Sequence, residues 1–242
     1  NMIYIHHHLG LGDHIICNGM VRHFIKRHGN VTLFCYERNK KNVEYMYRDL
    51  TNLKFIFVNS DIEVTNFIQD NNLENTTIRV GFETLMRYIG DGFNESFNYP
   101  EPRLTFDEAF YDMININFAV RFDEFYIERN LELENKVLEK LNPSNEKFIF
   151  IHDDPKRGYN IDLNKIDSPY KKIYNDMDFN IFDYLTLFDK AEEVHVMQSS
   201  FKDLINSYNF DSTKFFLHCY ARGTQWSDDF HSKGLNKFIK IE

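Results

Sequence analysis

The stretch that decides the fold covers residues 3–16 and has the sequence IYIHHHLGLGDHII. It predicts a short apolar strand, a turn containing Gly10 and Gly12, and a helix that begins near Asp13 and runs to about His28. The glycines let backbone N–H groups approach a ligand closely. Because ligands bind at the carboxyl ends of strands in parallel α/β sheets, this turn, with Asp13 and His14, is a candidate binding site.

Two simpler interpretations of this turn stay open from the residues alone. Asp13 can serve only as a helix N-cap, a position that aspartate favours. The glycine pattern is also an incomplete dinucleotide fingerprint, because Ile15 stands where the third glycine of G-x-G-x-x-G is expected. The stretch therefore predicts a ligand-binding turn without identifying the ligand.

Composition indicates a globular protein. The chain has 242 residues, of which 43% are hydrophobic and 16% aromatic, enough for one large or two small domains. No apolar run approaches the ~20 residues needed to span a bilayer, and no signal-peptide pattern is seen. The three cysteines, Cys17, Cys35 and Cys219, lie far apart and are expected to be reduced thiols. We expect a cytoplasmic protein.

Charge and histidine spacing argue against two classes of ligand. The formal net charge is −9, whereas proteins that hold nucleic acid usually carry a basic face, so a nucleic-acid partner is disfavoured. No cluster of His, Cys, Asp and Glu has metal-ligand spacing. His6, His7 and His8 alternate along a strand and cannot all face one ion, so no metal is expected.

Strands and helices alternate in the first half of the chain, which is the pattern of a parallel sheet with crossover helices. The expected strands are residues 2–6, 31–35, 53–58 and 76–80, and the expected helices are residues 13–28, 41–50 and 62–69. Val43, Met46 and Tyr47 share one face of the second of these helices. This half is Rossmann-like.

Residues 81–130 are dense in aromatic side chains and are interrupted by Pro100 and Pro102. Core packing explains such residues most simply, and an acceptor-binding pocket is the functional alternative. The aromatic residues are Phe82, Tyr88, Phe93, Phe97, Tyr99, Phe106, Phe110, Tyr111, Phe118, Phe122, Phe125 and Tyr126. A charged amphipathic helix is expected at residues 131–141, followed by a linker at 142–145.

A second alternation begins after the linker. Strands are expected at residues 148–152, 193–197 and 214–220, and helices at 181–190 and 200–208. The last twenty or so residues are mixed and are candidates to cross back to the first domain. The sequence thus predicts an α/β protein with two Rossmann-like domains, 1–142 and 143–242, that face a cleft.

A basic loop follows the first strand of the second domain, where residues 152–159 read HDDPKRGY. Lys156 and Arg157 are cations placed where a phosphate can bind, and Gly158 keeps the loop thin. Charge-assisted hydrogen bonds of this kind contribute ~1.5–3 kcal/mol each. The alternative is a solvated turn in which Asp153 and Asp154 neutralise these cations. His152 and Tyr159 bound the loop and are candidate donor-binding residues.

A second candidate anion site lies at residues 194–201, VHVMQSSF. An apolar strand leads directly into Gln198, Ser199, Ser200 and Phe201, where a helix begins. Serine caps helices well, and the free N–H groups and hydroxyls of such a turn also bind diphosphates. Capping accounts for one serine, and the second favours a binding site.

These three segments together resemble the GT-B glycosyltransferases, most nearly the heptosyltransferase-like (glycosyltransferase family 9-like) group. In that group a G-x-G-D turn opens the first domain and its aspartate is the general base; here the turn is residues 9–13, LGLGD. The group's basic loop and Ser/Thr/Gly-rich turn correspond to residues 152–159 and 198–201. This chain is shorter than usual and has Gln-Ser-Ser where the group has Asp-Thr-Gly, which leaves the donor open.

The resemblance implies transfer of a sugar from a nucleotide-sugar donor to the hydroxyl of a glycan or other acceptor, with inversion and without a metal. The nucleotide sugar would be a co-substrate, and no further cofactor is implied. Asp13 would accept the proton of the acceptor hydroxyl. The departing diphosphate would be stabilised by Lys156, Arg157, Ser199 and Ser200.

Three other functions remain as alternatives. A nicotinamide-dependent oxidoreductase is suggested by the Gly-x-Gly turn, with Glu37 as the residue that would bind the ribose. A second is a non-catalytic nucleotide-sugar-binding protein. A third is sugar transfer onto nucleic acid, which the acidic composition disfavours. The sequence leaves the sugar, the nucleotide, the acceptor and the oligomeric state open.

Overall fold

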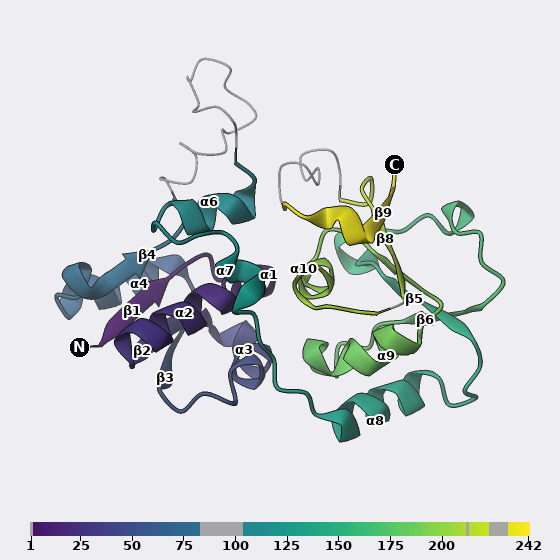
Figure 1. Ribbon diagram of the computed structural model, residues 1–242, viewed down its shortest axis with the longest axis horizontal. Coiled ribbons are helices and arrows are strands. Elements are labelled where there is room, and N and C mark those ends of the chain that lie inside the picture. Colours follow the sequence, from purple (N-terminus) through teal and green to yellow (C-terminus); the bar gives the residue numbers. More distant parts are fainter. Residues whose placement is uncertain (1, 83–103, 212, 223–231) are drawn as a thin grey trace, which may run out of the picture. The chain divides into compact units, whose positions relative to one another are not determined.

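The computed structural model describes residues 2–82, 104–211, 213–222 and 232–242. The chain divides into two compact units, Asn1–Glu128 and Arg129–Glu242. Each unit has its own sheet, β1–β4 in the first and β5–β9 in the second, as Figure 1 shows. All strand pairs in both sheets are parallel, so the α/β class expected from the sequence is confirmed.

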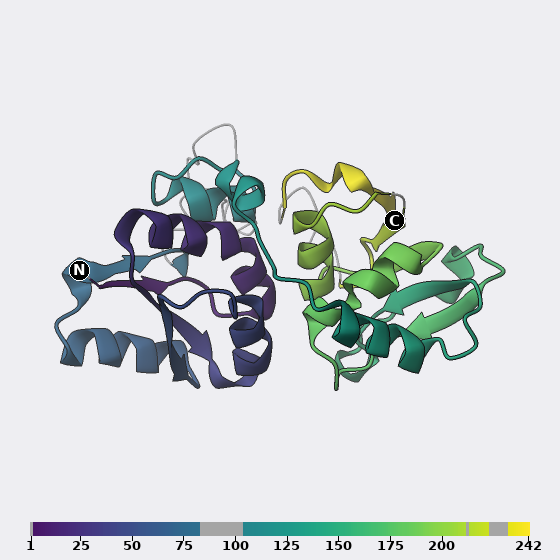
Figure 2. The same ribbon diagram turned by 60° about the horizontal axis from the view of Figure 1, so that its bottom comes forward.

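The first unit has a four-stranded sheet in the order β3-β2-β1-β4. The strands are β1 (Ile3–His6), β2 (Val31–Tyr36), β3 (Leu53–Val58) and β4 (Thr77–Arg79). The helices between and after them are α1 (Leu11–Ile16), α2 (Asn18–His28), α3 (Lys40–Met46), α4 (Asp61–Asp70), α6 (Phe106–Asp112) and α7 (Val120–Asp123), with 3-10 turns at η1 (Glu37–Asn39) and η2 (Glu74–Thr76). Figure 2 shows α2 and α4 on opposite faces of this sheet.

The core of the first unit forms on both faces of the central strands. Ile5 and Leu33 pair across β1 and β2 and are fully buried. On the α4 face, Phe34 packs with Val64 and Ile68. On α3 the face expected from the sequence, Val43, Met46 and Tyr47, is buried, which confirms that prediction.

The helix expected from residue 13 to residue 28 is two helices. The chain breaks at Cys17 (φ −87°, ψ 2°), between α1 and α2. The first helix also begins earlier, with Gly10 as its N-cap in an extended conformation, so Asp13 lies inside the first turn. The interpretation of Asp13 as a simple N-cap is therefore wrong.

A close backbone contact fixes α2 against α7. A Cβ atom built on Gly19 would lie 2.3 Å from the carbonyl oxygen of Val120, so a glycine is needed where the helix meets that backbone. Phe110 and Tyr111 of α6 are fully buried, as core packing of the aromatic segment predicts. Tyr88, Phe93, Phe97, Tyr99, Pro100 and Pro102 lie outside the described residues, and the acceptor pocket stays a prediction.

The second unit has a five-stranded sheet in the order β6-β5-β7-β8-β9. Its strands are β5 (Phe148–His152), β6 (Lys171–Tyr174), β7 (Glu193–Val196), β8 (Lys214–His218) and β9 (Phe238–Ile241). Its helices are α8 (Leu131–Leu141), α9 (Leu185–Lys190) and α10 (Ser200–Ser207), with 3-10 turns at η4 (Pro155–Arg157), η5 (Leu163–Lys165), η6 (Ile181–Tyr184) and η8 (Leu235–Lys237).

Several features of the second unit differ from the expectation. Strands β6 and β9 were not predicted, and the helix expected from residue 181 begins as the 3-10 turn η6. Near the end of the chain, residues Phe238–Ile241 pair with β8 as strand β9. The division of the chain falls before α8, because α8 packs on η6 and α9, whereas the linker was expected after it.

No helix among the described residues is long and apolar enough to cross a membrane.

Candidate functional site

In each unit the strands are parallel, so their carboxyl ends meet along one edge of the sheet, which is where open α/β folds bind ligands. The residues expected at the site from the sequence follow β1 in the first unit and follow β5 and β7 in the second.

The carboxylate of Asp13 lies directly over the turn that precedes it. A Cβ atom built on Gly10 would come within 2.6 Å of Oδ2 of Asp13. Gly10 therefore makes room for this carboxylate, which gives the first glycine of the motif a physical reason. Gly12 is the second residue of α1. Asp13 is partly exposed, as a group that meets a substrate must be.

His14 points into the interior of the first unit. Its ring is fully buried, and its centroid lies 4.5 Å from that of His7 in an edge-to-face arrangement. Burial lowers the pKa of His14 well below its usual value and lowers the pKa of His7 to about 3, so both rings are neutral. We assign His14 to the packing of the turn beside Asp13, although the sequence placed it among the substrate-binding candidates.

A second carboxylate at this edge was missed by the sequence reasoning. Asp61 is the first residue of α4, and its side chain remains 47% exposed. The hydroxyl of Tyr36 donates to Oδ2 of Asp61 at 2.7 Å, and Nε2 of His6 lies 3.2 Å from Oδ1. Burial lowers the pKa of His6 to about 4, so the ring is neutral and donates Nε2–H to the carboxylate. The signal in the sequence was an aspartate three residues after the end of β3.

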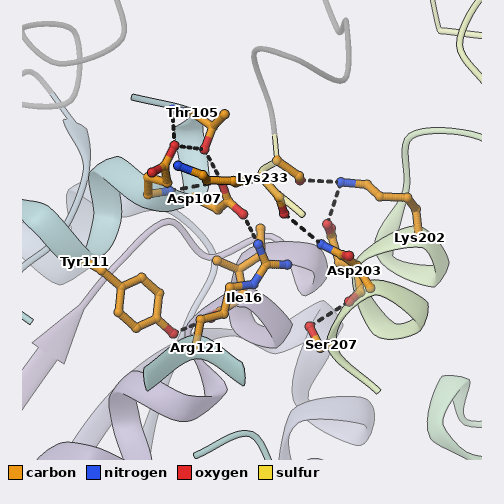
Figure 3. A network of polar contacts seen from close by, with 12 residues as sticks. Ile16, Thr105, Asp107, Tyr111, Arg121, Lys202, Asp203, Ser207 and Lys233 are labelled. Atoms are coloured by element: carbon orange, nitrogen blue, oxygen red, sulfur yellow. Dashed lines mark hydrogen bonds and ion pairs between the residues drawn. The ribbon is translucent and has the colours of Figure 1, made fainter. Parts of the chain in front are cut away.

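A buried charge network holds the end of α1 (Figure 3). Arg121 and Asp107 form an ion pair in which both side chains are fully buried. The hydroxyl of Thr105 donates to Oδ1 of Asp107 at 2.6 Å. Nearby, the hydroxyl of Tyr111 donates to the carbonyl oxygen of Ile16 at 2.7 Å. The bond from Tyr111 links α6 to the end of α1, the helix that carries Asp13.

In the second unit, two of the residues expected at the site, His152 and Phe201, pack against each other in the interior. Nδ1 of His152 lies 2.9 Å from Oδ1 of Asn175, and the ring centroid of His152 lies 4.5 Å from that of Phe201. Phe201 is 5% exposed and also packs on Phe150 and Tyr184. Burial lowers the pKa of His152. Both side chains position the start of α10 rather than present themselves to solvent.

The loop after β5 is a tight turn whose cationic side chains, Lys156 and Arg157, are exposed to solvent. Nε of Arg157 donates to Oδ2 of Asp154 at 2.6 Å, while the arginine side chain remains 60% exposed. Lys156 is exposed as well. Gly158 adopts a left-handed conformation (φ +81°) that closes the turn. The pairing of Arg157 with Asp154 is the feature expected of a solvated turn, and it leaves the guanidinium open to a ligand on its exposed side.

The turn after β7 places two serines at the start of α10. Ser199 is the N-cap residue, but its hydroxyl donates to the carbonyl oxygen of Met197 at 3.1 Å and does not cap the helix. Ser200 is the first helical residue and is partly exposed. Gln198 is 3% exposed. A helix N-terminus of this kind favours an anion by ~0.3–1 kcal/mol.

Arg222 joins these two segments and was missed by the sequence reasoning. Its Nη1 donates to the carbonyl oxygen of Gln198 at 3.0 Å, and its Cζ lies 5.1 Å from the ring centroid of Tyr159. The Cζ of Arg157 lies 5.4 Å from the same ring. The edge of the second sheet therefore brings two guanidinium groups, an aromatic ring and the start of α10 together. The available signal was an arginine shortly after the end of β8.

Among the described residues, no group of three or more His, Cys, Asp or Glu side chains is arranged to hold a metal ion. The two edges differ in chemistry. The first presents carboxylates that can accept protons or hydroxyl hydrogen bonds, and the second presents cations and helix N–H groups that can bind an anion.

The fold is similar over the whole chain to two solved glycosyltransferase structures. One is the crystal structure of the glycosyl transferase family 9 from Veillonella parvula, with 12% identity and a TM-score of 0.52 over 100% of this chain and 85% of that chain. The other is Escherichia coli ADP-heptose LPS heptosyltransferase II, with 8% identity and a TM-score of 0.55 over 100% of this chain and 90% of that chain.

No family model and no curated protein matches the sequence. At these identities the similarity establishes the fold, an α/β architecture with parallel sheets of the kind found in those glycosyltransferases.

Proposed function

We propose that the protein is a glycosyltransferase that moves a sugar from a nucleotide-sugar donor to an acceptor hydroxyl. The observation that carries this proposal is the position of Arg222, which contacts both the ring of Tyr159 and the backbone of Gln198 at the start of α10. A guanidinium beside a helix N-terminus is suited to a diphosphate, and the neighbouring aromatic ring is suited to a nucleoside.

The donor would bind the edge of the second sheet. Arg222 and the N-terminal turn of α10, with the hydroxyl of Ser200, would contact the diphosphate. Arg157 and Lys156 would contribute less, because they are exposed and Arg157 is already paired with Asp154. The fold similarity to a family 9 glycosyltransferase supports this assignment of the second unit.

The acceptor would bind the edge of the first sheet, and Asp13 would act as the general base. As the acceptor oxygen forms its bond to the anomeric carbon, its proton passes to the carboxylate of Asp13, and the bond between the anomeric carbon and the diphosphate oxygen breaks. The negative charge that develops on the leaving diphosphate would be stabilised by Arg222 and α10. Direct displacement of this kind inverts the anomeric configuration. The expected cleft between the two domains is part of this proposal.

The first test is a thermal-shift screen with UDP, GDP, ADP, CMP and NAD. A ligand that binds only the folded state stabilises it by ~2.7 kcal/mol at about 100 times its Kd, which such a screen detects. We expect a shift with one nucleoside diphosphate. A shift with NAD alone would instead favour the oxidoreductase alternative with Glu37.

The second test is turnover of the matching nucleotide sugar by Asp13→Ala. A general base contributes typically ~10²–10⁴-fold, so the rate should fall by about that factor while nucleotide affinity is kept. Asp70→Ala, at the exposed end of α4, is the matched control and should leave both quantities unchanged. Full activity of Asp13→Ala would remove Asp13 from the mechanism.

A further inference from the structure

A line of polar side chains crosses one face of the second sheet. Glu193 and His195 are two residues apart on β7, so their side chains project to one face, and His218 is the last residue of β8, with Tyr220 in the turn that follows. The register places His195 opposite Phe216, which is two residues before His218 on β8, so the side chains of Glu193, His195 and His218 share that face. Both histidines are at most 2% exposed.

These four residues form a continuous hydrogen-bonded chain. Nε2 of His195 lies 2.9 Å from Oε2 of Glu193, and Nδ1 of His195 lies 2.9 Å from Nε2 of His218. Nδ1 of His218 lies 2.9 Å from the hydroxyl of Tyr220. Finally, the backbone N–H of Asp162 donates to the same hydroxyl at 2.8 Å.

The donor and acceptor of every hydrogen bond in this series follow from Glu193, its first residue. Burial lowers the pKa of His195 and lowers the pKa of His218 to about 4, so each ring is neutral and carries a single N–H. The carboxylate of Glu193 only accepts, so His195 must donate from Nε2 and accept at Nδ1. His218 must then donate from Nε2 and accept at Nδ1, which fixes the hydrogen of Tyr220.

The hydroxyl of Tyr220 is thereby restricted to accepting from any further partner. Its hydrogen is committed to His218, one lone pair takes the N–H of Asp162, and burial raises its pKa, so the phenol stays protonated. Tyr220 follows the carboxyl end of β8, two residues before Arg222, and is partly exposed. Within the part of the chain that the structure describes, no further group bonds this hydroxyl, so its remaining lone pair can accept from a ligand at the proposed donor edge.

We infer that the Glu193–His195–His218 hydrogen-bonded chain fixes Tyr220 as a hydrogen-bond acceptor. Its hydroxyl would bind an O–H or N–H group in the part of the donor nucleotide outside the phosphates. Phosphate oxygens have no hydrogen to offer this hydroxyl, and the negative charges of Asp153 and Asp162 act on the same phenol. The inference rests on the proposed function for its ligand, whereas the direction of the chain stands independently of it.

Nuclear magnetic resonance tests the direction of the chain directly. Long-range ¹H–¹⁵N spectra of the wild-type protein report which ring nitrogen carries the hydrogen. We expect His195 and His218 both to be Nε2–H tautomers at pH 7. An Nδ1–H tautomer at either ring would overturn the inference, because Tyr220 would then be free to donate.

Binding of nucleotides tests the role of Tyr220. In Tyr220→Phe we expect affinity for the nucleoside diphosphate to fall about three- to tenfold, the loss typical of one hydrogen bond, while affinity for inorganic pyrophosphate is unchanged. Tyr174→Phe, at the end of β6, is the matched control, since its side chain is 44% exposed, and should leave both affinities unchanged. Equal losses for both ligands would overturn the inference.

A double-mutant cycle tests whether His218 acts through Tyr220. His218→Phe should lower nucleoside diphosphate affinity by a similar factor, and adding Tyr220→Phe should lower it no further. Additive losses would show that His218 does not position Tyr220. If no nucleoside diphosphate binds the wild-type protein, the proposed function and this inference both fall; if one binds and Tyr220→Phe matches wild type, only this inference falls.

Discussion

Both units have a parallel sheet whose strands end along one edge, but the side chains at the two edges differ in charge and in burial. In the first unit Asp13 and Asp61 are partly exposed, whereas other charged and ionisable groups are buried and held in place: Arg121 and Asp107 are fully covered, and His7 and His14 are neutral in the interior. In the second unit the cation Arg157 is largely exposed, and it pairs with Asp154 and lies near the ring of Tyr159. Parallel topology decides where a site lies, and the burial and sign of the charges decide what chemistry it can support.

The comparison makes its strongest prediction for the buried ion pair. Arg121→Met leaves the carboxylate of Asp107 buried without its partner, so the free energy of unfolding should fall by about 3–5 kcal/mol. Arg157→Met removes an exposed pair and should change it by less than about 1 kcal/mol. Urea denaturation of both variants measures the contrast. Similar losses in the two variants would contradict the distinction between the edges.

The next prediction concerns anion binding at the second edge. Arg222→Ala should weaken nucleoside diphosphate binding by about 10- to 100-fold, the value of one charge-assisted hydrogen bond. Arg157→Ala should weaken it by about threefold or less, because that guanidinium is exposed and already neutralised by Asp154. Isothermal titration calorimetry gives both affinities. A larger loss in Arg157→Ala would move the anion site onto the loop after β5.

The smallest predicted effect is a pH dependence in the first unit. The folded-state pKa of His7 is lowered to about 3, below that of the unfolded chain, so the unfolded state takes up the proton first as pH falls. The contribution of neutral His7 to the free energy of unfolding is therefore fully present above pH ~6.5 and is lost progressively as the pH falls below that value. Between pH 7.5 and 5.5, His7 should account for about 1.4 kcal/mol of the loss.

The His7→Asn variant measures this contribution. Between pH 7.5 and 5.5 its free energy of unfolding should fall by about 1.4 kcal/mol less than that of the wild type. Urea denaturation at both pH values measures the two changes. The exposed His28→Asn should retain the wild-type dependence. An unchanged slope in His7→Asn would show that the ring is not buried in neutral form.

The sequence predicts most of the fold because the inner strands are continuous apolar runs. Strand β3 was placed at residues 53–58, which are its bounds in the structure. Strand β6 was missed because only Ile173 of its four residues is buried, so its apolar pattern is too short to detect. The break at Cys17 was missed because apolar helical spacing continues across it.

The site could be predicted only where a motif is local in sequence. The turn with Gly10 and Asp13 is such a motif, because the two residues that pack together are only three positions apart in the chain. Arg222 and Tyr220 could not be recognised in this way. The backbone partner of Arg222 is Gln198, which follows β7, and the hydrogen-bond direction at Tyr220 is set through its neighbour His218 by His195 on β7, so both depend on the register of β7 and β8.

The outermost strands of the described sheets have a consequence for self-association. Each of these strands carries at least one exposed cationic side chain: Lys54 on β3, Arg79 on β4, Lys171 and Lys172 on β6, and Lys240 on β9. A lysine or arginine on an edge strand opposes pairing with the same edge of another molecule, because two like charges would be brought together. Acetylating the lysines in this aromatic-rich protein should therefore promote aggregation through its sheet edges while leaving the buried strands untouched.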